Sequence, residues 1–211
     1  MAFLLGKIIS ESDLDGFHYD KQGDTMPTKI PITGGPGTGK TTTLNLLGEK
    51  HTIVQEVARD LIDTQMKVEG GILPWTDIMT FQHMVHAVQK QRERGLTPGY
   101  VFLDRSHVDQ FAYVDVFHSR HEEDDFLSYS RQLVESANYA PFAFILDPVP
   151  PEIMEADPNY RKEDPETSLK IHKALEKVYT EFGIELLAVP FMPVSERVTL
   201  ITIETEKRVP K

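Results

Sequence analysis

The sequence predicts an α/β fold in which one parallel sheet of five strands is covered by helices on both faces. Short apolar segments alternate along the chain with segments whose apolar residues recur at helical spacing, and strands separated by helices form parallel sheets. The chain has 211 residues, of which 40% are hydrophobic and 26% charged. A chain of this length and balance can bury a core of ordinary size.

Five apolar segments are expected to form the strands. Each is short and is bounded by glycine, proline or polar residues, which is typical of strands buried in a parallel sheet. These segments are residues 29–33, 51–56, 99–104, 141–147 and 183–190.

Most of the segments between these strands are expected to be helices. The clearest is 169–182, where Ile171, Leu175, Val178 and Phe182 form one apolar stripe. The other expected helices are 40–50, 57–66, 76–94, 107–120, 121–137 and 194–208. The last of these contains several β-branched residues, so a strand remains an alternative there.

The beginning of the chain differs in composition from the rest. Residues 11–24 are rich in acids and turn formers, and a second methionine, Met26, stands just before the first expected strand. Two interpretations stay open: residues 1–28 form an N-terminal extension, or Met26 is the natural start. Residues 29–211 show no internal repeat or linker and are expected to form one domain.

Charge and composition exclude several classes of function. The net charge is −11, which argues against a nucleic-acid partner, because phosphate backbones require basic patches. The chain has no cysteine, so disulfides, thiol nucleophiles and Cys-ligated zinc are excluded. No apolar run approaches the roughly 20 residues of a membrane span. We expect a cytoplasmic protein without a signal peptide, and a homodimer or a protein partner is left open.

The most specific motif is GGPGTGKT at residues 34–41, which fits G-x-x-x-x-G-K-[ST] between an expected strand and an expected helix. Backbone N–H groups of such a loop surround phosphate oxygens, and the helix N-terminus adds a favourable dipole. Lys40 is expected to reach the β- and γ-phosphates, and the Thr41 hydroxyl to bind Mg²⁺. The expected nucleotide-binding residues are Gly34, Gly35, Pro36, Gly37, Thr38, Gly39, Lys40, Thr41 and Thr42.

A carboxylate at the end of a neighbouring strand is expected beside the phosphates. Asp104 ends the segment YVFLD and is the predicted magnesium-side carboxylate, with helix capping as the alternative. The residue after it is Arg105, whereas many ATPases carry a second acid there to activate water. The sequence also contains no Asn-Lys-x-Asp motif for reading guanine. A hydrolase is therefore disfavoured, and a GTPase still more so.

Charged side chains near the strand ends could bind an acceptor for the phosphoryl group. Glu56 and Arg59 are three positions apart, and Arg105 and Asp109 are four apart, so each pair can share a helical face. A carboxylate can orient or deprotonate a hydroxyl, and a guanidinium can hold a planar or anionic group. Two ordinary surface ion pairs are the alternative.

Residues 157–168, DPNYRKEDPETS, have the composition of a mobile lid. Arg161 in this segment would supply positive charge over the transferred phosphate, and a solvated charged loop is the alternative. The only tryptophan, Trp75, is interpreted mainly as a rim or core anchor, with stacking on an acceptor ring as the alternative. His83, His86, His118 and His121 lack a matching acidic ligand set and are interpreted as surface or packing residues.

Several segments together resemble the NadR-related P-loop family. They are ITGGPGTGKTT, VQEVARDLI, LPW, FLDRSHVDQFAY, FILDPVP, DPNYRKEDPE and AVPFMPVSERV, in this order. The family includes the ribosylnicotinamide kinase domain of NadR-type proteins and many AAA-labelled ATPase and kinase relatives. The resemblance covers about 29–203. NadR-type proteins carry an adenylyltransferase domain before the kinase domain, and residues 1–28 are not expected to form one.

The resemblance implies a nucleoside-kinase-like P-loop fold with a short lid. It also implies that the protein uses ATP and Mg²⁺. By the same matching, the acceptor side would contain Glu56, Arg59, Asp104, Arg105 and Asp109, and the lid would contain Arg161. Catalytic roles are expected for Lys40, Asp104, Arg105, Arg161 and Glu56. The leading hypothesis is phosphoryl transfer from ATP to a nucleoside- or nucleotide-like acceptor such as ribosylnicotinamide. The alternative is a P-loop ATPase or nucleotide-dependent switch that acts on a protein partner.

Overall fold

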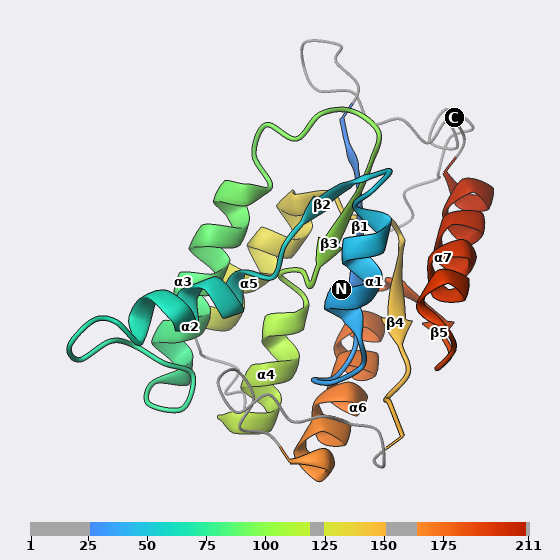
Figure 1. Ribbon diagram of the computed structural model, residues 1–211. Helices are drawn as coiled ribbons and strands as arrows, with labels where there is room; N and C mark the ends of the chain where they lie inside the picture. The colour runs from blue at the N-terminus through green and yellow to red at the C-terminus, as the bar shows by residue number, and fades with distance from the viewer. Residues whose placement is uncertain (1–25, 119–124, 151–163, 210–211) are drawn as a thin grey trace, which may run out of the picture.

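The computed structural model describes residues 26–118, 125–150 and 164–209 (Figure 1). In these ranges the chain forms a five-stranded sheet and seven α-helices. The predictions for residues 1–25 and for the lid arginine Arg161 lie outside the described residues, as does most of the expected lid. Within them, no helix is both long and apolar enough to cross a membrane.

All strands of the sheet are parallel, and their order is β2-β3-β1-β4-β5. Strand β1 is central, and its ladder with β4 begins at Ile32, directly after Pro31, which has no backbone N–H to donate. The strand order reverses direction beside β1, where ligands bind in parallel sheets. The strands are β1 (Thr28–Thr33), β2 (Thr52–Val54), β3 (Tyr100–Asp104), β4 (Phe142–Leu146) and β5 (Glu185–Val189).

Helices cover both faces of the sheet, as predicted. Alternate residues of one strand face opposite sides, so in β4 Phe142 and Phe144 pack toward α1 and α7, whereas Ala143 and Ile145 pack toward α4, α5 and α6. Helices α2 and α3 pack against each other beyond the β2 edge, around Val57 and Phe81 (Figure 1). The helices are α1 (Lys40–Leu47), α2 (Val57–Gln65), α3 (Ile78–Arg92), α4 (Asp109–Phe117), α5 (Asp125–Ala137), α6 (Pro165–Glu181) and α7 (Val194–Arg208).

Capping explains where the structure differs from the predicted boundaries. Helix α6 begins at Pro165 rather than at 169, because the Asp164 carboxylate accepts a hydrogen bond from Thr167 N–H at 2.7 Å and proline suits the first helical turn. Strand β2 ends at Val54 rather than at 56, and Glu56 instead stands directly before α2, where its side chain makes no capping hydrogen bond. Helix α7 is a helix despite its β-branched residues, since Ile201 and Thr205 are buried one turn apart on its inner face.

Candidate active site

The glycine-rich loop joins β1 to α1 and lies at the carboxyl edge of the sheet. Gly39, the residue before α1, has a φ of 83°, a left-handed conformation that glycine adopts without steric cost. Gly35 is required for a different reason, because a Cβ atom there would lie 2.8 Å from the Ser168 carbonyl oxygen. The predicted loop therefore has the backbone that a phosphate-binding turn needs.

Lys40 is buried in the loop. Its Nζ donates hydrogen bonds to the carbonyl oxygens of Gly34 and Gly35 at 2.9 Å each. Burial and the neighbouring Arg105 lower the pKa of the Lys40 ammonium to about 7. Phosphate oxygens beside this ammonium would favour its charged form and reverse that shift.

Two distant helices hold the loop in place. The Ser168 hydroxyl at the start of α6 donates to the Pro36 carbonyl at 2.7 Å. The Arg197 guanidinium of α7 donates from Nη1 to the Thr38 carbonyl at 2.9 Å and from Nε to the Met192 carbonyl at 2.8 Å. The sequence analysis named neither residue, although Arg197 is a buried cation in an otherwise ordinary amphipathic helix.

Asp104 lies at the end of β3, at the edge of the sheet where the loop turns, as predicted. Its carboxylate is 1% exposed, and neither oxygen has a hydrogen-bond partner among the described residues. Burial and the nearby Glu56 raise the pKa of Asp104 to about 7. A buried carboxylate without partners is costly, and a hydrated divalent cation next to it would supply the missing donors and charge. The residues present therefore fit Mg²⁺ held between Asp104, the Thr41 hydroxyl and a nucleotide.

The protein supplies few other ligands for such an ion. Across the described ranges, no group of three or more His, Asp and Glu side chains is arranged to hold a metal. Mg²⁺ typically binds with one or two carboxylates, waters and substrate phosphates rather than in an all-protein cage. The expected magnesium site thus depends on the nucleotide.

Arg105 connects the loop with the acceptor side. Its Nε donates to Glu56 Oε1 at 2.9 Å, its Nη1 lies 3.3 Å from the Gly34 carbonyl, and its guanidinium stacks over the Tyr113 ring at 5.2 Å. The backbone of Arg105 has a φ of 68°, in the left-handed region that non-glycine residues seldom adopt. This conformation directs the side chain back over the loop.

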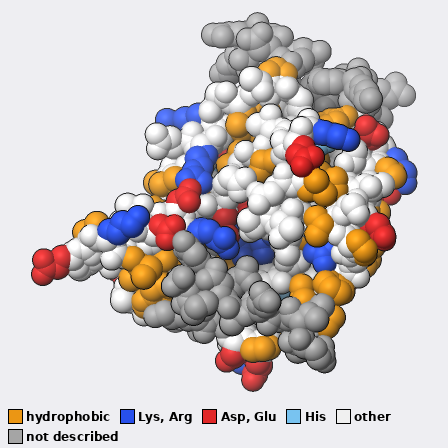
Figure 2. Space-filling model, viewed as in Figure 1, with side chains coloured by type: hydrophobic (Ala, Val, Ile, Leu, Met, Phe, Trp, Pro, Cys, Tyr) orange, Lys and Arg blue, Asp and Glu red, His pale blue; other side chains and the backbone are white. Residues whose placement is uncertain are grey.

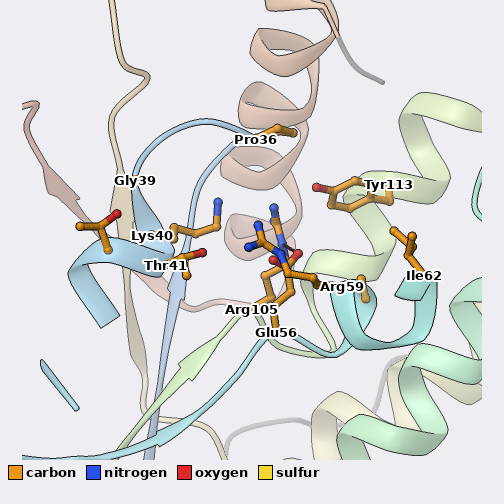
Figure 3. Close-up of a pocket in the computed structure, with 11 residues that line it drawn as sticks. Pro36, Gly39, Lys40, Thr41, Glu56, Arg59, Ile62, Arg105 and Tyr113 are labelled. Atoms are coloured by element: carbon orange, nitrogen blue, oxygen red, sulfur yellow. Dashed lines mark hydrogen bonds and ion pairs between the residues drawn. The ribbon is translucent and has the colours of Figure 1, made fainter. Parts of the chain in front are cut away.

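Glu56 is held in its charged form. Burial would raise its pKa, but the charges of Arg105 and Lys40 outweigh burial, and the pKa of Glu56 lies below its usual value. Figure 3 shows Lys40, Arg59 and Arg105 directed into one space, with Glu56 beside Arg105. The structure therefore brings together most of the predicted acceptor-side residues.

Of the predicted acceptor-side residues, Asp104 and Asp109 line neither of the cavities described below. Asp109 is 0% exposed. Its carboxylate accepts hydrogen bonds from the Thr33 hydroxyl at 2.6 Å, from Ser106 N–H at 2.9 Å and from the Tyr179 hydroxyl at 2.7 Å. It also pairs with Arg105 Nη1 at 3.3 Å. We therefore correct its expected place: Asp109 lies behind Arg105, in the core, because its oxygens are satisfied by groups of the protein.

Two adjoining cavities meet at Glu56 and Arg105. The first, here called the loop cavity, has a volume of about 110 Å³ and is lined by Lys40, Thr41, Thr42, Arg59 and other residues of the loop and α2. The second, here called the aromatic cavity, has a volume of about 240 Å³ and lies between α2, α3 and α4. Glu56, Arg105 and Tyr113 line both cavities.

Aromatic rings form much of the second cavity. Its lining includes Trp75, Phe81, Tyr113 and Phe117, together with the amide side chains of Gln82 and Gln110. Trp75 is 40% exposed at the rim, so it lies where the stacking alternative would place it. The sequence analysis did not name Tyr113 and Phe117, although their spacing of four residues on one helix could have suggested a shared aromatic face.

One face of the molecule has mixed charge. On the face shown in Figure 2, basic and acidic side chains are interspersed, with hydrophobic side chains between them. The cations that line the loop cavity are the buried Lys40 and Arg105 and the partly exposed Arg59.

Solved structures with a similar fold include kinases and a NadR protein. A deoxyadenosine kinase from M. mycoides aligns with a TM-score of 0.62 and 15% identity, covering 85% of this chain and 99% of that chain. A thymidylate kinase from Ehrlichia chaffeensis aligns with a TM-score of 0.58 and 14% identity, covering 85% and 99%. A NadR protein in complex with NR aligns with a TM-score of 0.64 and 15% identity, covering 88% of this chain and 52% of that longer chain.

At such identities these structures establish the fold, which is the P-loop kinase fold predicted from the sequence. No curated protein is similar enough to this sequence to count as a relative. The sequence itself matches a family model described as an AAA domain over residues 29–197. The match runs from β1 into α7 and ends at Arg197, which donates to the loop. Motif, fold and family match agree, and the chain belongs to this AAA-domain family, with the fold of the NadR-related P-loop proteins that it resembles.

Proposed function

We propose that this protein is a kinase that transfers a phosphoryl group from ATP, with Mg²⁺, to a hydroxyl of a nucleoside- or nucleotide-like acceptor. One observation carries the proposal: Glu56 and Arg105 line both the loop cavity and the aromatic cavity. A triphosphate in the first cavity and a ring-bearing acceptor in the second would meet at these two side chains. Positioning of this kind, together with electrostatic stabilisation, supplies most of the rate enhancement in phosphoryl transfer.

The phosphate side of the reaction is assigned to the loop. Backbone N–H groups and Lys40 would bind the phosphates, and Thr41 and Asp104 would hold Mg²⁺. When bound, this ion would neutralise charge on the phosphates. The Lys40 ammonium now donates to the carbonyl oxygens of Gly34 and Gly35, and it would exchange these acceptors for phosphate oxygens.

The acceptor side is assigned to Glu56, Arg59 and Arg105. Glu56 would orient the acceptor hydroxyl, whose oxygen forms a bond to the γ-phosphorus as the bond from that phosphorus to the β-phosphate oxygen breaks. The electron pair leaves with ADP, and the hydroxyl proton passes to the Glu56 carboxylate and then to water. Arg105 would stabilise negative charge on the transferred group, a role for which Arg161 remains a second candidate outside the described residues.

The comparisons support this assignment at the level of fold. Two of the similar structures are kinases of a nucleoside and of a nucleotide, and the NadR structures are complexes with NR and with NAD and AMP-PNP. Ribosylnicotinamide is therefore one candidate acceptor among nucleosides and nucleoside monophosphates. Because the family is described as an AAA domain, ATP hydrolysis that controls a protein partner is the alternative.

The test is ADP release by the purified protein with ATP and Mg²⁺, screened across ribosylnicotinamide, the common nucleosides and the nucleoside monophosphates. The proposal expects release that depends on one acceptor, together with a phosphorylated product identified by mass spectrometry. Lys40→Ala should abolish release, whereas Lys50→Ala, in the exposed turn after α1, should not. Slow release that is the same with every acceptor would overturn the kinase assignment in favour of the hydrolase.

A further inference from the structure

Gln82 on helix α3 is a buried amide in the wall of the aromatic cavity. Its side chain is 3% exposed, and its carbonyl oxygen Oε1 has no hydrogen-bond partner in the part of the chain that the structure describes. A buried carbonyl without a donor costs about 1–3 kcal/mol. Native proteins retain few such groups, so each one calls for an explanation.

A second glutamine on the same helix shows how such an amide is normally satisfied. Gln89 lies two turns later and is 2% exposed, and its Nε2 donates to Glu93 Oε1 at 2.7 Å. The carbonyl oxygen of Gln82 is among the buried, unpartnered atoms of the described residues, whereas that of Gln89 is not. Gln82 also lines the aromatic cavity, and Gln89 does not.

The other walls of the cavity fit a flat ring. Trp75, Tyr113 and Phe117 contribute aromatic side chains, and aromatic faces stack on planar groups. The amide of Gln110 is already fixed, since its Nε2 donates to the Ser106 carbonyl at 3.2 Å. The amide of Gln82 can still turn about its soft terminal torsion and present its oxygen to a ligand.

We propose that Gln82 is a specificity-determining residue, which accepts a hydrogen bond from an amino or amide N–H group on the ring of the acceptor. This inference rests on the proposed function for the identity of the cavity as an acceptor site. A ring that lacks the N–H group would leave the Gln82 oxygen buried and unpaired. Sites with buried polar groups discriminate strongly against ligands that cannot pair with them.

The test measures binding directly and without ATP. Trp75 is the only tryptophan and lies at the rim of the cavity, so its fluorescence reports occupancy. The probes are pairs that differ by one group: adenosine and purine riboside, cytidine and pyrimidin-2-one riboside, and ribosylnicotinamide and ribosylpyridine. The protein should bind the member with the N–H group about 5- to 100-fold more tightly in at least one pair.

Gln82→Leu should remove this preference, so that both members of the pair bind with similar Kd. It should leave the melting temperature unchanged or raise it, because it removes an unsatisfied buried group. Gln89→Leu is the matched control: it should lower the melting temperature, since it removes a satisfied hydrogen bond, but keep the preference. Loss of stability in Gln82→Leu with the preference retained would assign the residue a structural role and overturn the proposal.

The two proposals fail in different ways. If a ring compound binds with the preference but no phosphorylated product forms, the kinase assignment fails and the recognition role of Gln82 stands. If a product forms at equal rates from both members of every pair, the kinase assignment stands and the role of Gln82 is overturned. If no probe of any pair changes the fluorescence of Trp75, the cavity does not take nucleosides and the role of Gln82 is likewise overturned.

Discussion

Arg105 Nε donates a hydrogen bond to Glu56 Oε1 at 2.9 Å, although the two residues are 49 positions apart in the chain. This ion pair joins the end of β3 to the start of α2 and forms the boundary between the two cavities. Because the ion pair lies at this boundary, Glu56 is the most informative residue to substitute.

Glu56→Gln keeps the shape of the side chain and a hydrogen-bond acceptor for Arg105 but removes the negative charge. We expect acceptor-dependent turnover to fall by about 10²- to 10⁴-fold, because the hydroxyl loses its proton acceptor, while ATP binding is retained. Product formation and nucleotide titration measure the two effects separately. Asp60→Asn, four positions further on and ion-paired at the surface with Arg92, is the control and should be fully active. Equal activity of Glu56→Gln and Asp60→Asn would remove Glu56 from the mechanism.

Arg197→Met tests whether helix α7 holds the phosphate loop in shape. The substitution removes the donors to the Thr38 and Met192 carbonyls. We expect the free energy of unfolding to fall by about 1–3 kcal/mol and the KM for ATP to rise by about 10-fold, with little change for the acceptor. Urea denaturation and steady-state kinetics measure these effects. The exposed Lys207 on the same helix supplies the control, Lys207→Met. A KM that rises equally for both substrates would argue against a role specific to the loop.

Asp109→Asn tests the corrected role of this carboxylate. An amide in place of Asp109 would turn N–H groups toward donors such as Ser106 N–H and the Tyr179 hydroxyl. We expect a loss of about 3–5 kcal/mol in the free energy of unfolding, as for a broken buried ion pair. Tyr179→Phe should cost less, about 1–2 kcal/mol, because it removes a single donor. Full stability of Asp109→Asn would show that the carboxylate is not needed in the core.

A buried histidine pair predicts sensitivity to acid. Nδ1 of His86 lies 2.9 Å from Nδ1 of His107, and Nε2 of His86 lies 2.7 Å from the Ser130 hydroxyl. Two nitrogens at this distance can share only one proton. Burial lowers the pKa of His107 to about 4, and burial together with His107 lowers the pKa of His86 well below its usual value. The carboxylate of Glu93 opposes the shift of His107, while Lys29 and Lys90 reinforce it.

The sign of the effect follows from these lowered pKa values. The unfolded chain binds protons on the two histidines near pH 6.5, whereas the folded chain does not. The stabilisation is therefore complete above pH 6.5 and is lost as the pH falls toward 4, at about 1.4 kcal/mol per pH unit for each histidine. Urea denaturation between pH 7.5 and 5 measures it. His107→Leu should flatten this dependence, and His118→Gln, at the exposed end of α4, should leave it unchanged. An unchanged slope in His107→Leu would contradict the assignment.

The parts of the site that local sequence determines were predicted. Lys40 and Thr41 follow from a contiguous motif, and Asp104 follows from its position at the end of an apolar strand, so no long-range information is needed. The supports of the loop could not be predicted in this way. Ser168 and Arg197 contact the loop from 132 and 159 positions away, and their roles depend on how α6 and α7 pack over the sheet.

Asp109 is a different case: the argument from spacing was correct, but the predicted location on the acceptor side was not. Its spacing from Arg105 predicted that the two would share a helical face, and they do form an ion pair. That face is turned toward Tyr179 of α6 and away from the cavities. Spacing alone cannot distinguish a carboxylate that meets a ligand from one that meets the core.

The left-handed backbone at Arg105 also bears on how the family could diverge. Glycine or asparagine would adopt this conformation at lower cost, whereas most other residues lose about 1–2 kcal/mol there. Neither glycine nor asparagine carries a cation, so the interactions of the arginine charge must offset the cost of the strained backbone. The same charge pairs with Glu56 and with the buried Asp109, so glycine or asparagine here would relieve the backbone but leave two carboxylates without their cation. The ion pairs alone would therefore oppose replacement of Arg105, even in a relative that bound nucleotide without transferring phosphate.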